Sequence, residues 1–212
     1  VTSTKKLMDK KQLSNLVVRC LILKHTEENS KMVASGKYQD EIDYLVSSKS
    51  RNNFIKNLSL KIKGNTLILF QLVEKHGKGL YELIRNKSEN RDVFFVYGGV
   101  DAEQREKVRE ITEKSNNAII VASYGTFSTG INIRNLHNII FASPSKSRIR
   151  NLQSIGRGLR IGDSKETATL YDISDDLTYK EKKNFTLTHF QERINIYNEE
   201  GFTYEIHSVD LK

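Results

Sequence analysis

Three polar side chains near the end of the chain have the types and the spacing to act on phosphate. Gln153, Arg157 and Arg160 share a short stretch with the glycines Gly156 and Gly158. In a helix, positions four and seven residues apart lie on one face, so the amide and both guanidiniums would point the same way. Arginine keeps its charge and offers a planar fork of donors that suits phosphate oxygens. A solvated basic turn would explain the same residues, so the rest of the chain has to decide between the two.

A second candidate follows the apolar run 118–122. Ser123, Thr126, Gly130 and Asn132 belong to a stretch rich in glycine and hydroxyl side chains. Such a stretch at the end of a strand suits phosphate binding through backbone N–H groups. Gly130 would permit close approach, and Asn132 could hydrogen-bond a ribose hydroxyl. An ordinary polar loop fits this stretch equally well when it is taken alone.

Two further features could contact a nucleic acid. The turn Gly98-Gly99 precedes a helix start marked by Asp101, and backbone amides in such a turn can bind a phosphate. A tight turn that needs glycine is the plainer explanation. Arg148 and Arg150 lie just ahead of Gln153, where they could contact phosphate or simply form a solvated helix face.

Apolar strands alternate with helical segments along most of the chain. This order predicts an α/β fold, a mainly parallel sheet with helices on both faces. We expect a loop at 26–36. The predicted strands are 16–23, 66–70, 93–97, 118–122, 138–142, 168–173 and 202–206, and the predicted helices are 38–46, 53–62, 74–85, 101–115, 147–159 and 181–199.

The expected organisation is one domain in three parts. Residues 1–62 form a lead-in strand and a helical segment that join the sheet. Residues 63–175 form the regular core, and residues 176–212 add a helix and a short strand. Ligands of such sheets bind at the carboxyl ends of the strands, so the segments after Phe70, Tyr97, Ala122 and Ala142 matter most.

Composition limits the partners. The 212 residues have a formal net charge of +8, which favours a polyanionic partner such as nucleic acid. The same charge would also fit a soluble basic protein that binds no polyanion. The single cysteine, Cys20, excludes an intrachain disulfide and is expected in the core. No metal-ligand spacing and no membrane-spanning run are visible in the sequence. The chain begins with Val1 rather than Met, which fits a fragment.

The sequence also lacks the parts that bind ATP and Mg²⁺ by themselves. The phosphate-binding pattern G-x-x-x-x-G-K-[ST] is absent. Asp40-Glu41-Ile42-Asp43 resembles an acidic Mg²⁺ motif in its letters, but the buried strand that must precede it is missing. We interpret this segment as an amphipathic helix with exposed acids. The chain alone should therefore not hydrolyse ATP.

The order of these features resembles the second RecA-like domain of superfamily 2 helicases. Motifs IV, V and VI of that family would correspond to the strand end at Phe70, the stretch 122–132 and the Q-x-x-G-R-x-x-R pattern that starts at Gln153. The motif after motif IV would correspond to Tyr97-Gly98-Gly99. The resemblance covers about residues 60–175, and across the whole chain it extends to recombination helicases of bacteriophages within that superfamily.

The resemblance implies roles for individual residues. Arg160 would be the arginine finger, Arg157 its companion at the phosphates, and Gln153 the polar residue that couples phosphate to domain closure. Gly130 and Asn132 would lie beside the nucleotide. Phe70 would support the finger arginines. The residues implied to contact nucleic acid are Gly98, Gly99, Ser123, Thr126, Arg148 and Arg150.

The implied function is that of the C-terminal motor half of an ATP-dependent DNA helicase acting on branched DNA, single strands and R-loops. ATP and Mg²⁺ would be bound mainly by a first RecA-like domain of the same protein, outside this chain. The resemblance further implies a monomer in the cytoplasm, that of the host cell if the protein is phage-encoded. Thr129 before Gly130, and Gln153 in place of histidine, depart from RNA-type relatives and favour DNA. The alternative is a non-enzymatic nucleic-acid-binding or protein-interaction module with the same fold.

Overall fold

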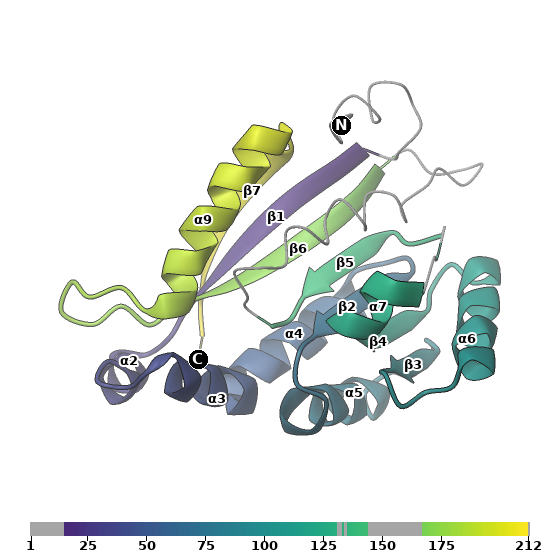
Figure 1. Ribbon diagram of the computed structural model, residues 1–212, viewed down its shortest axis with the longest axis horizontal. Helices are drawn as coiled ribbons and strands as arrows, with labels where there is room; N and C mark the ends of the chain where they lie inside the picture. The colour runs from purple at the N-terminus through teal and green to yellow at the C-terminus, as the bar shows by residue number, and fades with distance from the viewer. Residues whose placement is uncertain (1–14, 131–132, 134, 144–166, 212) are drawn as a thin grey trace.

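The computed structural model describes residues 15–130, 133, 135–143 and 167–211 (Figure 1). Its centre is a seven-stranded sheet in the order β3-β4-β2-β5-β6-β1-β7. Every pairing between these strands is parallel. The predicted, mainly parallel sheet is therefore confirmed. The strands are β1 (Asn15–Lys24), β2 (Thr66–Phe70), β3 (Val93–Val96), β4 (Ile119–Ser123), β5 (Asn138–Phe141), β6 (Thr167–Asp176) and β7 (Thr203–Asp210).

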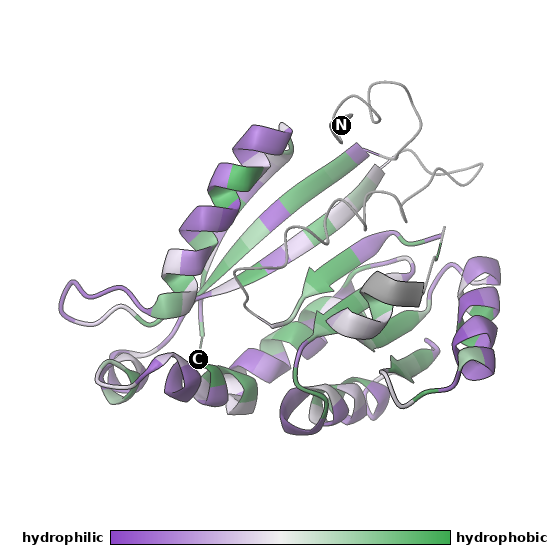
Figure 2. Ribbon diagram, viewed as in Figure 1, coloured by the Kyte–Doolittle hydropathy of each residue, from purple (hydrophilic) through white to green (hydrophobic). Residues whose placement is uncertain are grey.

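Helices cover both faces of the sheet, as parallel strands require because each crossover places its helix on a face. On one face α6 (Ala102–Lys114), α7 (Tyr124–Gly130) and α9 (Phe185–Glu200) pack on one hydrophobic cluster. On the other face α4 (Lys49–Lys61) and α5 (Lys78–Arg85) pack on a second cluster. In Figure 2 the strands are mostly green and the outer helix surfaces are mostly purple, as expected for this layering.

The residues of β1 show how the sheet divides the core. Leu16, Val18 and Cys20 belong to the cluster under α7 and α9, while Leu21 and Leu23 belong to the cluster under α4 and α5. Both sets are buried because β1 lies inside the sheet, between β6 and β7, and its two faces are covered by packed side chains of the two clusters. The expectation that Cys20 is a core residue is confirmed, since its side chain is fully buried.

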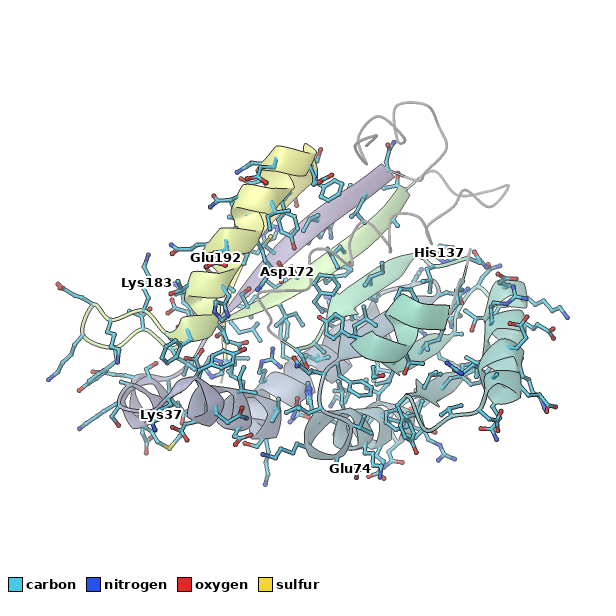
Figure 3. All side chains as sticks on the ribbon, in the orientation of Figure 1. Lys37, Glu74, His137, Asp172, Lys183 and Glu192 are labelled. Atoms are coloured by element: carbon cyan, nitrogen blue, oxygen red, sulfur yellow. The ribbon has the colours of Figure 1, made fainter. Side chains whose placement is uncertain are left out.

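A buried ion pair fixes α9 to the sheet. Arg193 donates from Nε and Nη2 to the carboxylate of Asp172 at 2.8 and 2.9 Å, and Tyr197 donates to the same carboxylate at 2.7 Å. Asp172 lies on β6, beside α9 in the view of Figure 3. Breaking a buried pair by removing one partner leaves an uncompensated charge, so this contact strongly disfavours detachment of α9.

Three local predictions were wrong. The segment expected as a loop at 26–36 contains α2 (Glu27–Val33), which begins because Thr26 accepts a hydrogen bond from the backbone N–H of Asn29. The stretch after β4, expected as a loop, forms α7 at once. The helix expected from residue 181 begins at Phe185, because Lys180 and Glu181 have positive φ values of 44° and 64°, which an α-helix does not accept.

The remaining described helices lie where the pattern predicted them, with shifted ends. They are α3 (Tyr38–Ser47) and a short π-helix, η1 (Val73–Gly77), that runs directly into α5. The predicted helix at 53–62 starts earlier, at Lys49, because the Ser48 hydroxyl accepts from the backbone N–H of Arg51. The predicted helix at 147–159 lies outside the described residues.

Candidate functional site

The carboxyl ends of β2, β3, β4 and β5 form one edge of the sheet, which we call the carboxyl edge. In the parallel register Phe70 is the partner of Ser123, and Leu69 is the partner of both Ala122 and Phe141. The chain segments that leave these strands therefore begin side by side, although they are far apart in sequence (Figure 1). This placement is where ligands bind in open parallel sheets.

Ser123 and Thr126 meet at this edge. Their hydroxyl oxygens lie 2.8 Å apart, and the Ser123 hydroxyl also accepts from the backbone N–H of Thr126 at 3.4 Å. Both side chains are buried. The Ser123 hydroxyl thus holds the first turn of α7 against the end of β4, and one hydroxyl hydrogen of the pair has no acceptor among the described residues.

Ser143 joins three parts of the edge, and sequence reasoning did not single it out. Its hydroxyl accepts from the backbone N–H of Gln71 at 3.0 Å and contacts Nδ1 of His76 at 3.3 Å. Its carbonyl accepts from the Tyr124 hydroxyl at 3.3 Å. Ser143 therefore connects the end of β2, the π-helix and the first residue of α7. The only local signal was its position between a predicted strand end and Pro144.

His76 is buried beside this junction as a neutral group. Burial, and next the charge of Arg51, lower the pKa of His76 to about 3. Its Nε2 lies 3.1 Å from the side-chain oxygen of Asn52, and its Nδ1 faces Ser143. The neutral ring must donate from Nε2 to that oxygen and accept at Nδ1. His76 acts here as a fixed bridge between α4 and the carboxyl edge.

A buried charge cluster supports the same edge from behind. Arg51 donates from Nε to both oxygens of Asp175 at 2.9 and 3.0 Å and from Nη1 to the carbonyl of Ala142 at 2.8 Å. His25 reaches the same carboxylate with Nε2 at 2.9 Å. Burial alone would raise the pKa of Asp175, but the Arg51 charge and the His25 contact outweigh it and hold this pKa below its usual range.

Phe70 is fully buried. Its ring stacks on Phe95 with centroids 5.6 Å apart. A Cβ on Gly77 would lie 2.4 Å from the Phe70 ring, so only glycine lets η1 pass this close. The ring is therefore locked between β3 and the π-helix.

Gly98 and Gly99 lie in the exposed turn after β3 and differ in what surrounds them. A Cβ on Gly99 would lie 2.6 Å from the Tyr97 ring, whereas a Cβ on Gly98 would meet nothing within 4 Å. Glycine at 99 has a structural reason. Glycine at 98 has no packing reason among the described residues, which leaves the close approach of a partner as its open explanation.

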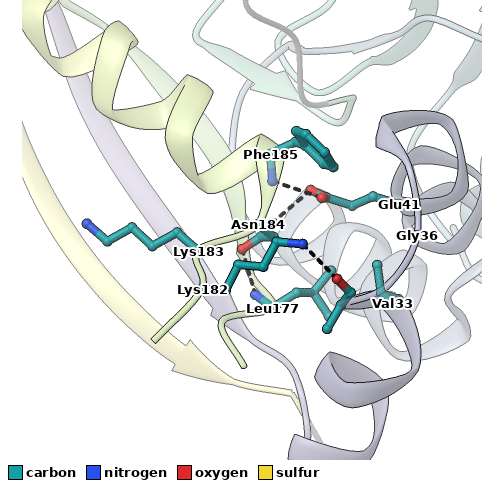
Figure 4. Close-up of a pocket in the computed structure, with 9 residues that line it drawn as sticks. Val33, Gly36, Glu41, Leu177, Lys182, Lys183, Asn184 and Phe185 are labelled. Atoms are coloured by element: carbon teal, nitrogen blue, oxygen red, sulfur yellow. Dashed lines mark hydrogen bonds between the residues drawn. The ribbon is translucent and has the colours of Figure 1, made fainter. Parts of the chain in front are cut away.

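The segment 40–43 forms α3, as predicted, but its acids are not all exposed. Glu41 is only 2% exposed and accepts from the backbone N–H groups of Phe185 and Thr186 at 2.9 and 2.8 Å. It also accepts from the Thr186 hydroxyl at 2.7 Å and the Asn184 amide at 2.8 Å. Figure 4 shows the carboxylate closed in by α9 and the preceding turn. Glu41 caps α9 and has little lone-pair capacity left for a cation.

The predicted motif VI and three other predicted site residues fall outside the part of the chain that the structure describes. Gln153, Arg157, Arg160, Arg148, Arg150 and Asn132 lie outside the described residues, and of Gly130 only the backbone, in α7, is described. The structure thus brings together Phe70, Ser123 and Thr126 at the carboxyl edge, with Gly98 and Gly99 in the turn that follows β3. It leaves the roles of all these residues as predictions.

Metal-binding clusters and membrane-spanning helices are both absent from the described residues. Within them no three His, Cys, Asp or Glu side chains gather in a way that could bind a metal ion. No helix in that part of the chain is long and apolar enough to cross a membrane.

Among the described residues the sheet is parallel throughout, helices cover both of its faces and polar groups gather at its carboxyl edge, the open α/β architecture to which RecA-like domains belong. A family model described as the helicase conserved C-terminal domain matches residues 49–162. The chain therefore belongs to the family of helicase C-terminal domains.

One relative is similar to this chain over nearly its whole length. The chain is 36% identical over 222 aligned residues to the ATP-dependent DNA helicase uvsW of Enterobacteria phage T4, covering 99% of this chain and 44% of the relative. The crystal structure of T4 UvsW superposes with a TM-score of 0.83 at 33% identity, covering 100% of this chain and 43% of that chain. The chain thus spans less than half the length of this relative.

A more distant structure shares the fold alone. The ATP-dependent Type ISP restriction-modification enzyme LlaBIII bound to DNA matches with a TM-score of 0.65 at 14% identity, covering 100% of this chain and 16% of that chain.

Proposed function

We propose that this chain is the C-terminal motor half of an ATP-dependent DNA helicase. The phage T4 relative, whose alignment covers 99% of this chain, bears the name of an ATP-dependent DNA helicase. The observation that carries the proposal is the carboxyl edge itself, where residues assigned to motifs IV and V by sequence are in hydrogen-bonded contact through Ser143. A helicase must couple nucleotide binding to the binding of a nucleic-acid strand. The hydrogen bonds of Ser143 connect the segment after Phe70 to the start of α7, so a movement of one segment would be passed to the other.

The residues of this chain would act on a nucleotide that it does not bind alone. ATP and Mg²⁺ would be held by a first RecA-like domain of the same protein, in the cleft facing the carboxyl edge. Arg160 and Arg157 would stabilise the charge that develops on the transferred phosphoryl group, and Gln153 would sense it. A finger arginine is worth roughly 10³–10⁵ in rate where one is used. Gly130 and Asn132 would border the nucleotide.

The nucleic-acid contacts would come from backbone and hydroxyl groups. Gly98 and Gly99 would contact the strand through their amides, and Ser123 and Thr126 would offer hydroxyls from the buried pair. Arg148 and Arg150 would neutralise phosphates. Contacts of this kind position a strand without reading its sequence, so closing and opening of the two domains would step the motor along DNA.

The substrates that fit this proposal are branched DNA and R-loops. Unwinding, branch migration and annealing of such structures serve recombination, repair and replication. We further propose that the protein works as a monomer in the cytoplasm, of the host cell if a phage encodes it.

The test is Arg160→Ala in the complete protein, assayed by ATP hydrolysis with and without single-stranded DNA. We expect turnover to fall by roughly 10³-fold or more, while DNA binding in fluorescence anisotropy stays close to that of the wild type. Arg85→Ala is the matched control, because Arg85 is an exposed arginine at the far end of α5. Wild-type turnover in the Arg160→Ala variant would refute the finger assignment, and no turnover in the wild type would favour a non-enzymatic module.

A further inference from the structure

One long stretch of the chain contains basic residues and no acid. Between Asp43 and Glu74 there are five lysines or arginines and not one aspartate or glutamate, in a protein with 26 acidic residues among 212. Four of the five are lysines, at positions 49, 56, 61 and 63. The fifth, Arg51, is buried against Asp175. The local excess of positive charge therefore belongs to α4 and the residues just after it.

Helix α4 separates its two kinds of residue by face. Arg51, Ile55 and Ser59 are buried and point to the sheet. The opposite face, at the spacing of 3.6 residues per turn, is lysine and asparagine with one half-buried leucine. We call the polar residues of this face and the turn after it the α4 ridge: Lys49, Asn53, Lys56, Asn57, Lys61 and Lys63.

The lysines of the α4 ridge have no acidic partner among the described residues. Lys56 donates a hydrogen bond to the side-chain oxygen of Asn53, a neutral group of the same helix, at 3.4 Å. Charged residues of other helices behave differently. Lys75 pairs with Asp43, Lys78 pairs with Glu74, and Arg109 pairs with two glutamates of its own helix. These three side chains are neutralised by acids close by, whereas the lysines of the α4 ridge gather on one helix face with no acid beside them.

The position of the α4 ridge connects it to the proposed site. Near the start of α4, Arg51 donates to the carbonyl of Ala142 at the end of β5. At the other end of α4, Ile62 is followed closely by the start of β2 at Thr66. The α4 ridge therefore begins at the carboxyl edge and runs to the opposite edge. From Lys49 to Lys61 it spans about 18 Å at 1.5 Å per residue.

We propose that the α4 ridge binds the phosphate backbone of double-stranded DNA, as a surface separate from the strand-gripping residues of the motor. Lysine and asparagine side chains are ordinary phosphate ligands that carry no sequence information. Surfaces for single strands combine positive charge with aromatic rings on which bases stack. The aromatic residue of α4, Phe54, packs instead on the core cluster. A duplex, whose bases are already stacked, fits a ridge of this composition.

The inference rests on the proposed function in that it takes DNA as the partner, and it adds a duplex arm to the substrate. A motor that moves a branch point must contact double-stranded DNA beside the strand on which it moves. The α4 ridge would hold that arm at a fixed angle to the carboxyl edge.

The test uses the complete protein, without ATP, and a fluorescein-labelled blunt duplex of about 30 base pairs. The triple variant Lys49→Gln, Lys56→Gln, Lys61→Gln should bind it about tenfold more weakly at low salt. The slope of log K against log salt should become shallower by about 2 to 3, since each phosphate contact contributes about 0.9. The control is Lys87→Gln, Lys107→Gln, Lys114→Gln, which removes the same charge from exposed lysines elsewhere and should change the slope little.

A cross-linking experiment locates the duplex. Cys20, the single cysteine of this chain, is buried, so a photoreactive maleimide will label an introduced Asn53→Cys selectively once any cysteines in the rest of the complete protein have been replaced by serine. We expect cross-links to the duplex from position 53 and few from an Asn116→Cys control. Equal slopes for the two triple variants, or cross-links from position 53 to another part of the protein, would overturn the proposal. ATP turnover on single-stranded DNA should be unchanged in the lysine variant, so this test and that of Arg160 fail independently.

Discussion

The replacement Glu41→Ala tests how the structure interprets the acidic segment 40–43. The Glu41 carboxylate accepts four hydrogen bonds, two of them from the first backbone N–H groups of α9. Those amides have no partner within their own helix. Asn184 cannot replace the carboxylate, because its side-chain oxygen already accepts from the backbone N–H of Leu177 at 2.9 Å.

The size of the effect follows from these contacts. A buried donor left without a partner costs about 1–3 kcal/mol, and two buried amides at the start of α9 lose theirs. The helix also loses an anion at its positive end, worth about 0.3–1 kcal/mol or more when partly buried. We therefore expect Glu41→Ala to lower the free energy of unfolding by about 4 kcal/mol. For a domain of this size this is a fall in Tm of about 8–16 °C.

The assay is thermal and urea unfolding followed by far-UV circular dichroism. Asp43→Asn is the matched control, because the Asp43 side chain is 44% exposed and its partners Lys75 and Gln39 also lie on the surface. We expect its Tm to equal that of the wild type within error. If Glu41→Ala were as stable as Asp43→Asn, the capping role would be refuted. If in addition it abolished ATP turnover in the complete protein, the Mg²⁺ interpretation of this segment would have to be restored.

Three further predictions concern the two glycines after β3, the buried His76 and the activity of the isolated chain. Gly98→Ala should keep the wild-type Tm but weaken DNA binding, while Gly99→Ala should lower the Tm because its Cβ meets the Tyr97 ring; equal DNA affinities would exclude backbone contact at 98. His76 stays neutral when folded and gains a proton when unfolded, so stability should fall by up to about 1.4 kcal/mol per unit as pH drops from about 6.5 towards 3. Urea titrations of His76→Gln should show a shallower fall. The isolated chain should hydrolyse no ATP in a phosphate-release assay with Mg²⁺, and its DNA binding should be weak and steeply salt-dependent.

The strands could be predicted because parallel strands buried on both faces are continuous apolar runs. The runs at 66–70, 118–122 and 138–142 coincide with β2, β4 and β5 to within a residue. The short helices were missed for a different reason. Residues 26–36 and 123–133 are polar or glycine-rich, and a few side-chain caps, at Thr26 and Ser123, outweighed that composition.

The functional motifs and the surroundings of the site were not equally visible. Ordered patterns such as Q-x-x-G-R-x-x-R identified the family, because spacing along a helix is a local property. Glu41 and Ser143 were misjudged or missed because their partners lie far away in the chain. Glu41 caps a helix at residues 184–186, and Ser143 bonds to Gln71 and Tyr124.

The sequence by itself determined the fold class, the family and the absence of a phosphate-binding loop, since these depend on local runs and spacings. Only the tertiary structure decided which polar groups are bound to partners inside the fold and which are not. It buried Glu41 as a cap, fixed His76 as a neutral bridge and joined Arg51 to Asp175, while it left the lysines of α4 without acidic partners among the described residues. The physical reason is that a charge becomes structural or available according to what packs against it, and chain neighbours do not reveal that.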